Sequence, residues 1–348
     1  MTKTSIFITA LLLISTAHLQ AQDELKLYLW EDSLSPKIQA KIEKAYDTQL
    51  QLHYLDNDDE RNKLMLNSRS LPFDIVVFDN VSANIYGEQG ELVNLKDLPN
   101  RRHNEPRWDK VCGQYAVPYF WGTLGLVYRE SKFSVPPSSW NQLLYPSDEI
   151  KGHIGLLEDS VETLIPALFS LGYSSHTSEP SELKEAFNIL KSIQSNVLTY
   201  EYPISYVRSH PDSDDLHLAM AYSGDQYSLN QYLNEKDWKY VVPNEGTYIW
   251  VDCLAVSAHS KQTELAKKIL NELMEPITAA ANANEVMVAT PNKSAMDLLP
   301  ISYITDKTLF PSQEIIEKSV IDSDMSVNNI NLRAKIINNI VTSHEAKY

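Results

Sequence analysis

The sequence is poor in the residues from which metal centres and nucleophilic active sites are built. It contains 2 cysteines among 348 residues, and its 9 histidines are scattered without a helical pair. The motifs GxSxG, GxxxxGK[ST], HExxH and GxGxxG are all absent. We therefore expect no metal, no cofactor and no enzyme activity, with glycoside hydrolysis by paired carboxylates as the alternative.

Positive charge is also scarce. The chain has 30 lysines and arginines against 46 acidic residues, which gives a net charge of −16. Nucleic acids and anionic membrane surfaces bind to basic patches, so neither is expected as the main ligand. A cationic ligand fits this charge, but so does an acidic surface that only keeps the protein in solution.

Long apolar runs are confined to the N terminus. Lys3, the run from Ile6 to Ile14, and the small residues Ala17 and Ala21 are typical of a signal peptide over residues 1–21. No later stretch reaches the roughly 20 apolar residues of a transmembrane helix. Since no cysteine near the cleavage positions could carry a lipid, we expect an exported, soluble monomer in the periplasm.

The two cysteines, Cys112 and Cys253, lie far apart in the sequence. They are too few for a zinc site and do not form a CxxC motif. The periplasm permits disulfides, but spacing alone does not show whether two Cα atoms approach closely enough for one. A structural disulfide and two separate thiols both remain open.

Strand and helix patterns alternate along the chain, which predicts an α/β fold with parallel strand pairing. The expected strands are at 25–30, 49–55, 72–79, 115–128, 152–157, 216–222 and 247–258, and the expected helices at 36–49, 59–68, 159–173, 180–195, 261–274, 314–319 and 331–347. The long apolar segment 115–128 is typical of a chain that crosses between domains. Two lobes joined by several crossings would form a hinged clamshell with a ligand cleft between them. The predicted boundaries are 22–125 and 250–300 for lobe 1, and 126–249 and 301–348 for lobe 2 with the C-terminal helices.

Carboxylates recur beside aromatic side chains at the predicted strand ends. In open α/β sheets, ligands collect at the carboxyl ends of the strands. Trp250 and Asp252 are two residues apart on a strand, so they face the same side and can hold an amine by cation–π attraction and a charged hydrogen bond. The alternative is a core tryptophan beside a solvated aspartate. The residues that show this pattern are Trp30, Glu31, Asp32, Asp79, Tyr222, Trp250 and Asp252.

Asp159 and Glu162 open a predicted helix and are three residues apart. This spacing places both on one side, where they could hold one ammonium group. The same Asp-x-x-Glu pattern is also a capping box, which satisfies free backbone N–H groups at a helix start. From the residues alone we favour the cap.

Several motifs are specific in combination: LYLWED, PFDIVVFD, YAVPYFWGT, LLEDSVETLIPALFSLGY, LAMAYSGD, VVPNEGTYIWVDCLAV, VATPN and KTLFP. With them, residues 25–320 resemble the periplasmic spermidine/putrescine-binding proteins. The resemblance implies a two-lobed periplasmic binding fold of type II that closes on a linear polyamine. It implies ligand contacts by Trp30, Asp32, Asp159, Glu162, Tyr222, Trp250 and Asp252, which reverses our preference for a mere cap.

Departures from the family pattern bear on specificity. Glu31 and Asp79 stand where neutral hydroxyl residues are expected, Asp322 where glutamine is usual, and Val81 and Val288 where tyrosines are common. More carboxylates and fewer phenols favour a triamine such as norspermidine or spermidine over putrescine. The WED run looks like that of the norspermidine-sensing branch, whose members act with an inner-membrane cyclic-di-GMP enzyme that controls biofilm formation. The alternative partner is an ABC permease for polyamine uptake.

Overall fold

The structure is a computed structural model of the chain, and it describes residues 23–55, 61, 64–65, 72–323 and 325–346. The predicted signal peptide and most of the helix predicted at 59–68 lie outside these residues. Within the described part of the chain, no helix combines the length and the apolar character that crossing a membrane requires.

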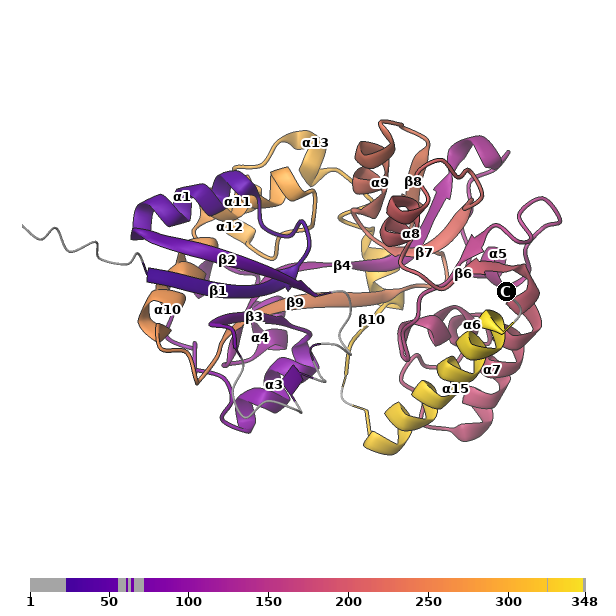
Figure 1. Cartoon of the computed structure of the whole chain (residues 1–348), viewed down its shortest axis with the longest axis horizontal. Coiled ribbons are helices and arrows are strands. Elements are labelled where there is room, and N and C mark those ends of the chain that lie inside the picture. Colours follow the sequence, from indigo (N-terminus) through magenta and orange to yellow (C-terminus); the bar gives the residue numbers. More distant parts are fainter. Residues whose placement is uncertain (1–22, 56–60, 62–63, 66–71, 324, 347–348) are drawn as a thin grey trace, which may run out of the picture.

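Ten strands form one mixed sheet that runs through two lobes (Figure 1). Its order is β2-β1-β3-β9-β4-β7-β5-β6, with β10 paired to β9 and β8 paired to β4. Parallel pairing is correct for β1 with β2 and β3, and for β5 with β6 and β7. It is wrong for the central strands, because β9 is antiparallel to β3 and β4, and β4 is antiparallel to β7.

The first lobe has its own apolar core. Leu25, Leu27 and Leu29 of β1 are buried in it, and Tyr28 and Trp30, which alternate with them, also pack against this core. Each fully buried leucine contributes about 1.5–3 kcal/mol. Tyr303 and Leu309, which follow the predicted boundary at residue 301, pack in this first core. Its elements are β1 Asp23–Trp30, α1 Pro36–Tyr46, β2 Thr48–Leu55, β3 Ile75–Phe78, α3 Asn80–Glu88, η1 Pro99–His103, α4 Pro106–Cys112, α10 Thr263–Leu273, α11 Pro276–Val286, α12 Lys293–Met296 and α13 Ile301–Ile304.

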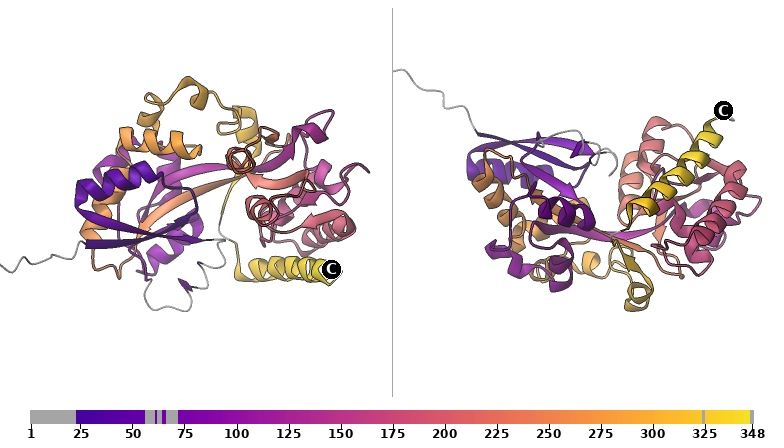
Figure 2. Two further views of the ribbon diagram at one scale, coloured as in Figure 1. Left: turned by 45° about the horizontal axis from the view of Figure 1, so that its top comes forward. Right: turned by 90° about the horizontal axis from the view of Figure 1, so that it is seen from below.

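The second lobe contains two further apolar clusters, one around β5, α6 and α7 and one around β7, β8 and α8. Helix α15 packs on α7 and supplies Ile337, Ile340 and Val341 to the first of these clusters (Figure 2). The elements are η2 Glu130–Lys132, α5 Asn141–Leu144, β5 Ile154–Gly155, η3 Glu162–Leu164, α6 Ile165–Ser170, α7 Pro180–Ile193, η4 Gln194–Asn196, β6 Val197–Thr199, α8 Pro203–Ser209, β7 Leu218–Tyr222, α9 Asp225–Leu233, β8 Trp238–Val241 and α15 Val327–Glu345.

Two long strands run from one lobe into the other, β4 at Ala116–Arg129 and β9 at Tyr248–Val256. The first half of β4 pairs with β9, and its second half pairs with β7 and β8. After helix α14 at Gln313–Lys318, the short strand β10 at Val320–Ile321 pairs with the start of β9 and leads to α15. The two lobes therefore meet along the β4–β9 pair.

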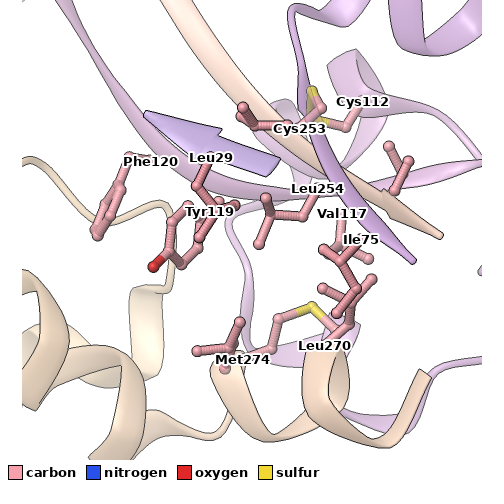
Figure 3. Close-up of a cluster of buried hydrophobic side chains, with 14 of the residues drawn as sticks. Leu29, Ile75, Cys112, Val117, Tyr119, Phe120, Cys253, Leu254, Leu270 and Met274 are labelled. Carbon is pink, nitrogen blue, oxygen red and sulfur yellow. A yellow bond between two sulfur atoms is a disulfide. The ribbon is translucent and has the colours of Figure 1, made fainter. Parts of the chain in front are cut away.

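Cys112 at the end of α4 and Cys253 of β9 form a disulfide with a Cα–Cα distance of 5.6 Å. Both residues are fully buried, beside Val117 and Leu254 of the first core (Figure 3). The disulfide fixes β9 to the helix that precedes β4. It therefore holds the first-lobe end of the connection between the lobes.

Candidate ligand site at the junction of the lobes

Strand β9 places three candidate side chains on one face. Tyr248, Trp250 and Asp252 alternate with the buried residues Ile249 and Val251, as the period of a strand requires. Asp252 Oδ1 accepts a hydrogen bond of 2.9 Å from the indole Nε1 of Trp30, the last residue of β1. Two segments 222 residues apart thus meet here, and the indole N–H orients the carboxylate.

Gly122 of β4 makes room for the indole of Trp250. The two residues are register partners, and a Cβ at Gly122 would lie 2.3 Å from Trp250 Cζ2. No larger residue fits without moving the indole. On the other side, the Tyr222 ring meets Trp250 edge to face, with centroids 6.1 Å apart. The two rings form an aromatic wall, and Trp250 is part of it because its neighbour is glycine.

Asp159 and Glu162 divide the two roles predicted for them. Asp159 Oδ1 accepts the backbone N–H groups of Val161 and Glu162 at 2.7 and 2.6 Å, as a cap does. Glu162 does not complete a capping box: its Oε2 accepts a 2.5 Å hydrogen bond from the Tyr222 hydroxyl. Burial, together with the negative charges of Glu162 and Asp159, raises the pKa of Tyr222 well above its usual value, so this phenol stays a donor.

Tyr248 links further carboxylates to the same face. Its pKa is raised by burial first, and then by the negative charges of Asp322, Glu162 and Asp79. His176 Nε2 lies 3.4 Å from Asp322 Oδ1, so a protonated His176 would form an ion pair with it. Tyr248 is a residue of this candidate site that the sequence analysis missed, although its place two residues before Trp250 was the available signal.

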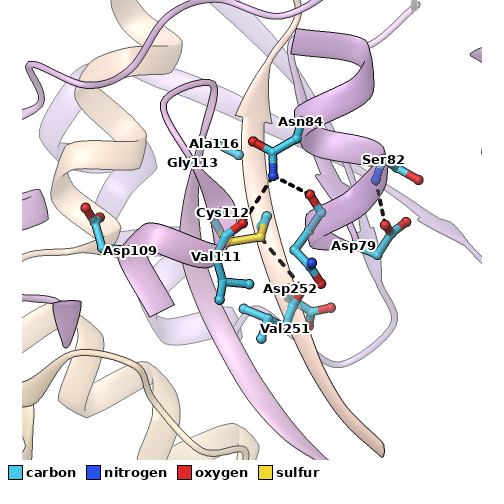
Figure 4. Close-up of a disulfide and its surroundings, with 12 residues drawn as sticks. Asp79, Ser82, Asn84, Asp109, Val111, Cys112, Gly113, Ala116, Val251 and Asp252 are labelled. Carbon is cyan, nitrogen blue, oxygen red and sulfur yellow. Dashed lines mark hydrogen bonds between the residues drawn. A yellow bond between two sulfur atoms is a disulfide. The ribbon is translucent and has the colours of Figure 1, made fainter. Parts of the chain in front are cut away.

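Asp79 is held by its own lobe. Its Oδ1 accepts the backbone N–H of Ser82 at 2.7 Å and so caps α3 (Figure 4). Its Oδ2 lies 2.6 Å from Nη2 of Arg61, whose side chain is fully buried over the Phe78 ring. Asp79 therefore stabilises the start of a helix, and Arg61 of the same lobe offsets its charge.

Glu31 and Asp32 contact a cation from the other lobe. Arg208 Nη1 lies 2.6 Å from Glu31 Oε2, and Arg208 Nη2 lies 3.4 Å from Asp32 Oδ2. No local sequence signal pointed to Arg208, because it lies 177 residues from Glu31. The departures Val81 and Val288 supply no polar side chain to the site, and Val288 packs against the first core.

The arrangement suits a flexible chain with several positive charges. Aromatic faces attract ammonium groups and cover methylenes, while carboxylates accept charged hydrogen bonds. No cluster of three or more metal-ligating side chains occurs within the residues that the structure describes. The contacts above connect Asp159, Glu162, Tyr222 and Trp250 with one another, and Trp30 with Asp252, which shares a strand face with Trp250. The role of these residues in ligand binding stays a prediction.

A groove away from these residues has the opposite charge. A groove of about 330 Å³ on the first lobe is lined by Lys96, Arg101, Arg102, Lys110 and Lys293, together with Asp109. Part of it is the basic RRHNEPR segment at 101–107. These cations would repel an amine, so the groove is not the place for a cationic ligand.

Residues 37–311 match the family of bacterial extracellular solute-binding proteins. The chain belongs to this family. The members bind solutes and are not enzymes, which confirms the expectation that the chain has a binding function. The structure agrees with this assignment: a solved structure of a proposed spermidine/putrescine ABC transporter protein from Listeria monocytogenes superposes with a TM-score of 0.81, at 25% identity over 92% of this chain and 99% of that one.

Two relatives refine the position of this chain within the solute-binding proteins. The norspermidine sensor of Vibrio cholerae is 44% identical over 97% of this chain and 94% of its own length. The spermidine/putrescine-binding periplasmic protein of Escherichia coli is 27% identical over 90% of each chain. The resemblance to the polyamine-binding proteins, the α/β solute-binding fold and the periplasmic location are thus confirmed.

Proposed function

We propose that the chain binds a linear triamine, norspermidine or spermidine, at the junction of its lobes and reports the bound ligand to an inner-membrane protein. The observation that carries the proposal is that two sets of contacts meet on strand β9. Glu162 and Tyr222 reach Trp250, and Trp30 holds Asp252, which lies on the same face of the strand as Trp250. This arrangement sets carboxylates at intervals along an aromatic wall. A triamine with a charge near +3 matches this pattern of charge and apolar surface.

The binding mechanism follows from the charges. Carboxylates that share one site repel each other, and an ammonium group placed between them removes this repulsion. Glu162 belongs to the second lobe, while Trp30 and Asp252 lie with the first core, so a ligand that contacts both ends favours the closed arrangement. Binding energy then shifts the population of the hinged states, as in lobe closure generally.

The sensor role is supported by the relatives. Identity to the norspermidine sensor is 44%, against 27% for the spermidine/putrescine-binding protein of Escherichia coli. We infer an inner-membrane partner that makes or degrades cyclic di-GMP and so controls biofilm formation. The alternative is delivery of the polyamine to an ABC permease, which the second relative favours. A neighbouring gene for a membrane cyclase or phosphodiesterase, or instead a permease and ATPase operon, separates the two.

A deletion strain decides between sensing and uptake. It is complemented with the wild type, with Asp252→Asn, or with Asp148→Asn, whose carboxylate is 93% exposed beside Lys151. Uptake of labelled norspermidine and biofilm mass are both measured. We expect uptake to be equal in all strains, and the biofilm response to norspermidine to disappear in the deletion and Asp252→Asn strains alone. Loss of uptake on deletion would contradict the sensor role.

A further inference from the structure

Arg208 joins the two lobes at one end of the site. It lies near the end of α8, whose Ile204, Tyr206 and Val207 pack in the second lobe. Its partners Glu31 and Asp32 directly follow β1 of the first lobe. Arg208 bridges two carboxylates, because each of its two terminal nitrogens contacts a different one. A guanidinium of the second lobe therefore occupies the place where the sequence predicts ligand ammonium groups.

Both sides of this contact are held in position. The Arg208 guanidinium lies over the Tyr232 ring, 4.4 Å from its centroid, which fixes its plane. Its side chain is 25% exposed, against 52% for Glu31 and 70% for Asp32. Asp32 has a left-handed backbone with a φ of 59°, a conformation that aspartate tolerates better than most residues. The turn after Trp30 is thus shaped to present two carboxylates.

We propose that Arg208 is an internal cation of the ligand site, which neutralises Glu31 and Asp32, ties the lobes together before ligand binds, and limits the site to three ligand ammonium groups. The first two consequences follow from the contact across the lobes. The third rests on the proposed polyamine-binding function. A fourth ammonium that reached this end would meet the fixed positive charge of Arg208 and be repelled.

Interlobe distances in the ligand-free protein test whether Arg208 ties the lobes together. Spin labels are placed at Lys44→Cys on α1 and Lys184→Cys on α7, which are both exposed, while the native cysteines stay in their disulfide. Electron–electron double resonance then gives the ratio of closed to open forms. For Arg208→Gln we expect this ratio to fall about 2- to 10-fold, the range for two partly exposed ion pairs. A distribution identical to that of the wild type would overturn the proposal.

Two further variants show whether an effect on closure comes from the charge of Arg208 or from a damaged fold. Arg208→Glu should open the lobes more than Arg208→Gln, and adding Glu31→Arg should bring the closed population back. If the exchanged charges did not restore the closed population, Arg208 would not tie the lobes together. Arg107→Gln is the matched control, because Arg107 pairs with Glu105 inside the first lobe. It should leave the distances unchanged.

Calorimetry with two amines tests the specificity. We expect Arg208→Gln to improve the affinity for spermine, a tetraamine, relative to norspermidine by about 3- to 10-fold, because one opposing charge is removed. An unchanged affinity ratio would overturn the limit to three ammonium groups. If the wild type bound neither amine, the proposed function would fail. The distances measured without ligand would still show whether Arg208 ties the lobes together.

Discussion

Replacing Asp252 by asparagine removes one negative charge from the site with little change in side-chain shape. The amide oxygen of asparagine can still accept the Trp30 indole hydrogen bond of 2.9 Å, so the junction of β1 and β9 should stay intact. What is lost is the charged hydrogen bond to a ligand ammonium, worth about 1.5–3 kcal/mol. We therefore expect the Kd for norspermidine to rise about 10- to 150-fold, measured by isothermal titration calorimetry.

A control is needed because every charge removed from an acidic protein weakens the binding of a cation through the overall field. Asp148→Asn removes the same charge at an exposed position paired with Lys151. Salt screens such distant charges, so this variant should bind nearly as the wild type does. If Asp252→Asn bound norspermidine within about twofold of Asp148→Asn, a difference of less than 1 kcal/mol, Asp252 would not contact an amine and the reasoning would be refuted.

Three further predictions concern the scaffold of the site. Replacing Cys112 and Cys253 by serine opens a loop of 141 residues, and the free energy of unfolding in urea should fall by about 2–5 kcal/mol; an unchanged value would mean that the disulfide does not form. Burial raises the pKa of Asp225 from 3.8 to about 7, so its stabilising contribution is present below pH 4 and is lost as the pH rises to 7. Asp225→Asn should flatten the fall of the unfolding free energy across this window by up to about 4 kcal/mol, and an unaltered slope in urea titrations would contradict this. Gly122→Ala places a methyl group against the Trp250 indole and should weaken norspermidine binding in calorimetry, whereas unchanged binding would show that the indole position is not needed.

The sequence predicts those parts of the fold that depend on local periodicity. The strand at 25–30 and the helix starting at Pro36 are found as β1 and α1, because apolar spacing and the N-terminal proline act over a few residues. The helix predicted at 159–173 is shorter, with α6 only at Ile165–Ser170 after a 3₁₀ turn at Glu162–Leu164. The Asp159 cap begins that turn, and the leucine- and proline-rich pattern gives no sign of where it ends.

The central antiparallel pairing could not be predicted in the same way. Its direction depends on how β4 and β9 cross between the lobes. The sequence of one strand does not show in which direction a strand so distant in the chain will pair with it. Helix α11, with the sequence PITAAANANEV, was missed because its alanines and asparagines lack an amphipathic pattern. Helix α9 follows the cap residue Gly224, which has a φ of 109°, and is largely polar, so it also lacks an amphipathic pattern.

The candidate site likewise has a part that local periodicity predicts and a part that it does not. Trp250 and Asp252 share a face because a strand has a period of two, and this was foreseen from the sequence alone. The pairing of Arg208 with Glu31 and of Arg61 with Asp79 depends on side chains brought together by folding. A count of acidic residues in the sequence therefore exceeds the charge that the protein offers to a ligand.

A crystal structure with norspermidine tests the central claim most directly. The account predicts one triamine at the junction of the lobes, with its methylenes against Trp250 and Tyr222 and its ammonium groups within hydrogen-bond distance of Glu162 and Asp252. Amine density elsewhere on the molecule, or none at this junction under saturating norspermidine, would contradict it.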